Sequence, residues 1–205
     1  MHNWILCTYL SWVLSLSFSC GYYHAMTLDV NSMVWILRSW GRPFRLVSPL
    51  LGCSSPETTP IQVECGWPFS AVLTRSGDVY VWPFWGAFEG QYWRTMAKLD
   101  KDNSTKAILP RGGTVIPCHI SEMKMDPVKL PTLPNLPDLL ETGLPEEAYR
   151  KETKLIKIAG LDGCLVGLTN KGHVLKLDKL DAEHPNLVWN YVSEYTDDLA
   201  PLLKL

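Results

Sequence analysis

The side chains that come closest to a catalytic set lie in the middle of the chain, where His119 is followed by Ser121, Glu122 and Asp126. Serine, histidine and a carboxylate are the members of a hydrolytic triad. The sequence, however, contains no nucleophile motif G-x-S-x-G, no phosphate-cradling glycine loop and no metalloprotease motif H-E-x-x-H. We therefore interpret these residues as solvated polar side chains, and we expect a protein that is not an enzyme.

The cysteines do not favour metal chemistry. They include no C-x-x-C pair, and Cys118 and His119 have no companion pair at zinc-finger spacing. Cys65 and Cys164 lie beside or within apolar runs, which indicates buried and reduced thiols. We expect no metal site and no cofactor.

An internal repeat decides the architecture. The stretches CGWPFSAVLTRSGDVYVW and AGLDGCLVGLTNKGHVLKL repeat each other at an offset of 95 residues, which places Gly77 on Gly172. A third and weaker copy lies 45 residues upstream of the first, where Leu28 falls on Leu73. Units that repeat at about 45–50 residues are typical of the blades of a β-propeller.

Each copy predicts a β-hairpin. Two apolar runs flank a short polar turn in which Gly77 or Gly172 supplies a positive φ. Alternation after the second turn predicts that His173 and Lys176 face water, whereas Trp82 stands in register for the core. A single blade leaves an apolar face that only its neighbours cover. The predicted fold class is therefore all-β, a partial β-propeller with blades of short antiparallel strands and a long irregular insert.

The chain divides into three parts on this interpretation: residues 1–25, residues 26–195 and residues 196–205. The first is an apolar segment without charged residues, which has the length of a signal-peptide core but no preceding Lys or Arg. It is either a cleaved signal or an atypical start, and it is too short for a comfortable transmembrane helix. The second is the partial propeller, and the third is a tail.

The propeller is interrupted by an insert at residues 88–150. Its later part, KLPTLPNLPDLL, has leucine at positions 130, 133 and 136 with proline at intervening positions. A period of three is that of the polyproline II helix, so we predict an extended segment with its leucines along one edge. This segment is either a stiff connector laid over the propeller edge or a docking ligand for an aromatic groove.

Charge excludes one class of partner. The net charge of −2 gives no basic face of the kind that nucleic acids require. We expect neither a nucleic acid nor a membrane as partner.

Protein binding is the better interpretation, and two groups of residues are candidates for it. Arg42 and Arg45 flank Phe44, and arginine with aromatic residues is the composition of an interaction hot spot. Alternatively, the two arginines bond blade carbonyls and Phe44 packs inward. Trp85 and Trp93 border the insert, where they are candidates for exposed contact residues.

The repeat resembles a known family. The pattern I-x-V-x-C-G-x-x-x-S-A-x-L-T-x-x-G-x-V-Y-x-W at residues 61–82 is similar to the repeat of the regulator-of-chromosome-condensation family, which builds seven-bladed propellers. The strings SWGRPFRLVSPLL and KLIKIAGLDGCLVGLTNKGHVLK resemble more narrowly the fungal F-box proteins called SCF-associated factors. A seven-bladed ring needs roughly 350 residues, so the three visible copies predict part of a propeller.

The resemblance implies the substrate-recognition subunit of a Skp–cullin–F-box ubiquitin ligase, acting inside the cell in the cytoplasm or nucleus. Its partners would be a protein destined for ubiquitin-dependent degradation and, through an F-box, the Skp adaptor; residues 1–31 contain no F-box-like sequence. Two alternatives stay open. One is a nucleotide exchange factor for Ran on chromatin, and the other is a secreted ligand-binding propeller.

Overall fold

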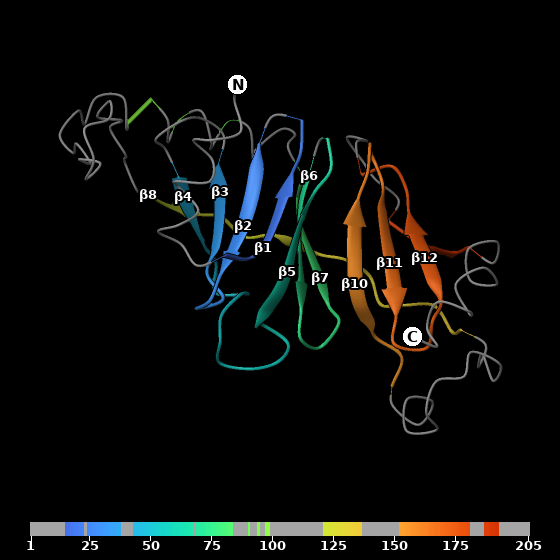
Figure 1. Ribbon diagram of the computed structural model, residues 1–205. Helices are drawn as coiled ribbons and strands as arrows, with labels where there is room; N and C mark the ends of the chain where they lie inside the picture. Colours follow the sequence, from blue (N-terminus) through green and yellow to red (C-terminus); the bar gives the residue numbers. More distant parts are fainter. Residues whose placement is uncertain are drawn as a thin grey trace.

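The computed structural model describes residues 15–22, 24–37, 43–67, 69–83, 121–136, 152–180 and 187–192, together with residues 90, 94, 97 and 98. Within these residues the strands form three sheets that lie side by side (Figure 1). The first sheet has the order β1 (Ser15–Cys20), β2 (Ala25–Asp29), β3 (Val34–Leu37), β4 (Pro43–Val47) and β8 (Ser121–Lys124). The second has β5 (Pro60–Cys65), β6 (Phe69–Thr74), β7 (Val79–Pro83) and β9 (Val128–Lys129). The third has β10 (Leu155–Gly160), β11 (Leu165–Thr169), β12 (Val174–Leu177) and β13 (Trp189–Tyr191).

These sheets are consecutive blades, which we call blade 1, blade 2 and blade 3. Each begins with its innermost strand, and β5 lies between β1 and β10 at the common axis. The prediction of an all-β partial propeller is confirmed. Blade 1 begins at Ser15, earlier than the expected boundary at residue 26, because β1 pairs antiparallel with β2 and contacts β5.

The repeated turns have the predicted conformation. Gly77 has a φ of 95° and Gly172 a φ of 83°, and each amide donates to the carbonyl oxygen three residues earlier. A Cβ atom on Gly77 would lie 2.7 Å from the Cβ of Lys154, so the site requires glycine for space as well as for φ. Blade 1 places Ser32 at the equivalent position with a φ of 58°. A non-glycine residue in this region is uncommon, so the first copy keeps the turn conformation without the glycine of the other two copies.

Two apolar cores fill the spaces between the blades. We call the side of a blade that faces the next blade in chain order its leading face. The first core joins the leading face of blade 1 to blade 2, where Trp82 is fully buried as predicted and donates from Nε1 to the carbonyl oxygen of Met125 at 3.2 Å. The second joins the leading face of blade 2 to blade 3 and contains Leu73, Leu165 and Leu175. Strand β6 is buried along its whole length because both of its faces are covered.

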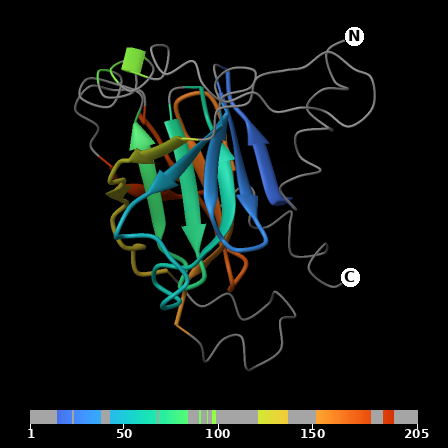
Figure 2. The ribbon, with the colours of Figure 1, turned by 90° about the vertical axis from the view of Figure 1, so that its left-hand side faces the viewer.

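The prediction of an irregular insert is corrected at residues 121–136, which we call the strap, because they contain two short strands. Strand β8 pairs parallel with β4, and β9 pairs antiparallel with β7. Both partners are the outer strands of their blades, whose free backbone groups an added strand can satisfy. Figures 1 and 2 show the strap in yellow, crossing from blade 1 along the edge of the sheets. Leu130, Leu133 and Leu136 all pack against the second core, which confirms the predicted leucine edge.

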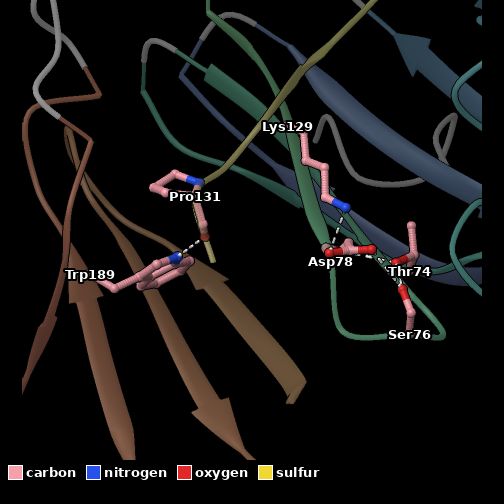
Figure 3. A network of polar contacts seen from close by, with 6 residues as sticks. All are labelled: Thr74, Ser76, Asp78, Lys129, Pro131 and Trp189. Carbon is pink, nitrogen blue, oxygen red and sulfur yellow. Dashed lines mark hydrogen bonds and ion pairs between the residues drawn. The ribbon is translucent and has the colours of Figure 1, made fainter. Parts of the chain in front are cut away.

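Polar contacts fasten the strap to blades 2 and 3 (Figure 3). Lys129 Nζ lies 2.9 Å from Asp78 Oδ1, and Ser76 Oγ donates to Asp78 Oδ2 at 3.0 Å. Trp189 Nε1 in blade 3 donates to the carbonyl oxygen of Pro131 at 3.2 Å. The strap is thus bound by its own chain at the edge of the propeller, with a tryptophan as one of its anchors.

The expectation that His173 faces water is wrong. His173 is fully buried and its ring lies edge-to-face with Tyr191 at a centroid distance of 5.6 Å. Lys176 is half-exposed and pairs with Asp178 at 2.8 Å. The two residues are three positions apart and therefore point to opposite faces of the sheet. Among the described residues, no helix has the length and apolar character needed to cross a membrane.

Candidate functional site

The structure does not assemble the predicted arginine and aromatic group as a surface. Phe44 is 1% exposed and packs in the first core, which agrees with the inward-packing alternative and not with a binding role for this residue. Arg45 forms an ion pair with Glu122 of the strap, which engages its guanidinium group within the molecule. Arg42, Trp85 and Trp93 lie outside the described residues.

The cluster considered for catalysis is not brought together in the described residues. Glu122 is paired with Arg45, and Asp126 accepts a hydrogen bond from Ser48 Oγ at 2.8 Å. His119 lies outside the described part of the chain. Both carboxylates thus hold the strap to blade 1, which is a structural role.

The repeat instead builds a site at the propeller axis, beginning with a clamp between inner strands. Ser17 Oγ in β1 accepts from the amide of Val63 at 3.2 Å, and Ser19 Oγ accepts from the amide of Cys65 at 3.0 Å. A buried amide needs such a partner because β1 and β5 belong to different sheets and share no ladder. The side chains of one blade therefore hydrogen-bond the backbone of the next.

The same clamp recurs 45 residues later. Gln62 donates from Nε2 to the carbonyl oxygen of Ile158 at 2.7 Å, and its Oε1 accepts from the Ile158 amide at 3.0 Å. Glu64 Oε2 accepts from the Gly160 amide at 3.5 Å. Gln62 and Glu64 occupy the repeat positions of Ser17 and Ser19. The three inner strands are thus fixed side by side by one repeated device.

Beyond the clamp, each inner strand ends in an equivalent turn. The amides of Gly21, Gly66 and Leu161 each donate to the carbonyl oxygen three residues later, at 2.8–3.0 Å. These turns surround a pocket of about 570 Å³. Its lining consists of three consecutive residues from each blade: Cys20, Gly21 and Tyr22; Cys65, Gly66 and Trp67; and Gly160, Leu161 and Asp162. We call these nine residues the axial pocket.

Glycine lets the inner strands converge at this pocket. A Cβ atom on Gly21 would lie 2.6 Å from the carbonyl oxygen of Gly66, and one on Gly160 would lie 2.5 Å from the carbonyl oxygen of Cys65. Real side chains do not approach backbone so closely. The floor of the axial pocket is therefore made of closely spaced backbone that no larger residue could replace.

Aromatic side chains rise beside this floor. Tyr22 is 72% exposed and Trp67 49% exposed, and their rings lie edge-to-face at a centroid distance of 5.7 Å. Leu161 on the third turn is 52% exposed. Aromatic residues near the centre of a contact surface are typical of interaction hot spots. Such exposed apolar side chains gathered around a hollow form a surface suited to binding.

Sequence reasoning missed this site, although a signal was present. Tyr22 and Trp67 occupy one repeat position, and in these two of the three copies the residue follows a Cys-Gly pair. An aromatic residue kept at a turn tip, where packing does not require it, points to a surface role.

The thiols of the axial pocket are not set up as nucleophiles. Burial raises the pKa of the Cys20 thiol, and burial raises the pKa of Cys65 to about 12. Both thiols therefore stay protonated at neutral pH, and a protonated thiol is a poor nucleophile. Cys65 and Cys164 are buried and free, which confirms the prediction of reduced core thiols.

Comparisons with known proteins give structural neighbours only. No protein-family model matches the chain, and no curated protein matches it. Human WBSCR16 aligns with a TM-score of 0.44 at 18% identity, over 83% of this chain and 35% of that one. Prp20p from Saccharomyces cerevisiae, studied for its binding to Gsp1p and histones, aligns with a TM-score of 0.40 at 14% identity, over 86% of this chain and 37% of that one. Yeast RCC1 (Prp20) bound to Kap60 aligns with a TM-score of 0.38 at 13% identity, over 83% of this chain and 36% of that one. The chain spans about a third of the length of each of these structures.

Proposed function

We propose that this chain is a protein-interaction propeller whose axial pocket and its aromatic rim receive a protein ligand. One observation carries the proposal: three equivalent turns place the exposed side chains of Tyr22, Trp67 and Leu161 around a single hollow. The thiols there are protonated at neutral pH, and the side chains converge without a nucleophile and base pair. Binding without catalysis is the activity that such a surface supports.

The finer form of the proposal is substrate recognition for a Skp–cullin–F-box ubiquitin ligase, inside the cell in the cytoplasm or nucleus. Its support is the resemblance of the repeats to those of the fungal SCF-associated factors. The propeller would hold the protein to be ubiquitinated, and an F-box elsewhere in the natural product would hold the Skp adaptor. This role needs a docking surface on the propeller, and the axial pocket is the best candidate for it.

The test is affinity capture of the natural full-length product with proteasome activity blocked. We compare the unaltered protein with the double variant Tyr22→Ser, Trp67→Ser, and with Val188→Ser as a control, because Val188 is 52% exposed but lies on blade 3 away from the axis. We expect Skp with all three, and a ubiquitinated protein with all but the double variant.

The outcomes separate the two levels of the proposal. Absence of Skp from every capture would overturn the ligase role but leave the axial pocket as a binding site. Retention of the same captured proteins by the double variant would overturn the axial pocket as the binding site. Stimulated release of GDP from Ran by the purified protein would replace the ligase role with nucleotide exchange, the other activity that the repeat resemblance implies.

A further inference from the structure

We infer that the axial pocket accepts the cationic side chain of a lysine or arginine presented by an extended segment of the partner protein. The inference rests on the proposed function, because it assumes that a protein ligand reaches the axial turns. It adds the chemistry of the residue that this ligand must offer. Three properties of the pocket carry it: its charge, its aromatic rim and its size.

The charge of the pocket favours a cation. Asp162 is exposed at the rim, and it is the one acidic or basic residue among the nine residues of the axial pocket. Glu64 lies directly behind the floor, where its carboxylate bonds Ser19 and the amide of Gly160. Among the described residues, no lysine or arginine lines the pocket. An anionic ligand such as a phosphate would meet carboxylates here without a compensating cation.

Asp162 is available for a partner. Within the described residues it forms no ion pair, unlike Asp78 and Asp178, which are each paired with a lysine. Its repeat equivalents are Tyr22 and Trp67, so the third blade places a carboxylate where the first two place aromatic rings. A ligand entering between the three turns therefore meets two rings and one negative charge.

The aromatic rim suits the same ligand. Both rings of this edge-to-face pair are exposed to solvent, so they present aromatic surface to a ligand. A lysine ammonium or arginine guanidinium over the face of Trp or Tyr is attracted by the ring quadrupole. The methylene stem of the same side chain can lie on apolar surface such as that of Leu161. Aromatic rings together with a carboxylate thus match both parts of a long basic side chain.

The size of the pocket leaves room for such a side chain. Its volume of about 570 Å³ lies within the range of small-ligand sites, so one long basic side chain can enter without displacing the glycine floor. The backbone that carries it would rest on the rim, against Tyr22, Trp67 and Leu161.

The experiment uses the full chain and a set of fluorescein-labelled nine-residue peptides of glycine and serine with one central residue. That residue is lysine, arginine, glutamine or glutamate. Anisotropy reports binding, and mass spectrometry reports the rate at which N-ethylmaleimide modifies Cys20, the exposed thiol of the pocket. We expect the lysine and arginine peptides to bind at least about tenfold more tightly than the glutamine peptide and to slow modification of Cys20.

Two variants locate the effect. Asp162→Asn keeps the shape of the rim and removes its charge, so we expect it to reduce binding of the basic peptides about fivefold or more. Asp78→Asn is the matched control, because Asp78 pairs with Lys129 at the Gly77 turn, at the opposite end of blade 2 from the pocket. We expect this variant to bind like the unaltered protein. Added salt should weaken binding of the basic peptides to the unaltered chain.

Every outcome decides the inference. Equal binding of the glutamine or glutamate peptide, failure of the basic peptides to protect Cys20, or equal effects of the two aspartate variants would overturn it. None of these results would remove the proposed function, which depends on the capture experiment with the Tyr22 and Trp67 double variant. Loss of that capture effect, in turn, would remove the proposed function whatever the peptides do.

Discussion

The leading faces of blade 2 and blade 3 carry the same repeat positions in different surroundings. In blade 2, Ala71 and Leu73 are fully buried against blade 3. In blade 3 the equivalent residues, Val166 and Leu168, are only half-buried. At these two positions the residues are alike, alanine with valine and leucine with leucine, so their difference in burial reflects what packs against each face. The stability of a blade therefore depends partly on the apolar contacts that its neighbour provides.

Blades 2 and 3 also differ in the side chains at the clamp positions of their inner strands. Blade 2 holds β10 through Gln62 and Glu64, whereas blade 3 has Lys157 and Ala159 at these positions. Alanine has no side-chain donor or acceptor, and a lysine can donate but cannot accept from a backbone amide. On the third blade the apolar part of the repeat is kept while the polar clamp is absent. Four predictions test how much of the stability depends on a covered face.

The largest effect is expected from Leu73→Ala. Removing a fully buried leucine leaves a cavity, and such changes cost about 2–5 kcal/mol. The matched variant Leu168→Ala removes the same atoms from a half-buried site and should cost about 1 kcal/mol, in line with the lesser area taken from water. Urea unfolding measures both. Equal losses would show that the face of blade 3 is covered as well as that of blade 2.

The clamp gives the next largest effect. Gln62→Ala removes both hydrogen bonds to Ile158 and leaves a buried amide and carbonyl without partners, a cost of about 1–3 kcal/mol. Lys157→Ala changes the equivalent residue of blade 3, which is exposed, and should stay within about 0.5 kcal/mol of the unaltered protein. Thermal unfolding of the two variants side by side makes the comparison. A loss for Lys157→Ala as large as that for Gln62→Ala would contradict the account.

A smaller effect is expected where the strap meets blade 3. Trp189→Phe keeps most of the buried ring but removes the hydrogen bond from Nε1 to Pro131, at a cost of about 1 kcal/mol. Because this bond fixes the strap, limited proteolysis should cut the segment around Pro131 faster in the variant. Trp82→Phe, which loses the bond to Met125, is the control at blade 2 and should expose the segment around Met125 instead.

The smallest effect is expected from Lys129→Ala. The hydrogen bond with Asp78 raises the pKa of Lys129, and the pair is partly exposed, so its loss should cost about 0.2–1 kcal/mol and less in high salt. A raised folded pKa means that the contribution is complete below the unfolded pKa of about 10.4 and is lost as the pH rises through the folded value. The difference between the two proteins should be constant from neutral pH to about pH 9 and vanish in stronger alkali. A difference that fell already near neutral pH would contradict this assignment.

Sequence alone predicted the parts of this fold that repeat. The offsets of 45 and 95 residues placed the hairpins, the positive φ of Gly77 and Gly172, and the core position of Trp82, because stacking forces the same pattern on each blade. The strands of the strap were not predictable in this way. Strand β9 has two residues, and so short a segment becomes a strand only because the edge of β7 is there to pair with.

The candidate site also has parts that a local sequence pattern cannot predict. Phe44 and Arg45 looked like a surface group because arginine beside an aromatic residue is frequent at interfaces, but alternation along β4 buries one and half-exposes the other. The axial pocket depends on three turns that are up to 141 residues apart, from Gly21 to Asp162. Only the register of the repeat joins them, and a local motif carries no sign of that proximity.

The strap has a consequence for how this molecule comes apart. In a repeat protein each unit contacts only its neighbours, so end units can fray independently and unfolding can proceed in steps. Here one continuous stretch of sixteen residues, from 121 to 136, touches the first, second and third units together. Unfolding of any one blade therefore also removes contacts that the strap makes with the other two. The strap thus couples the unfolding of the three blades.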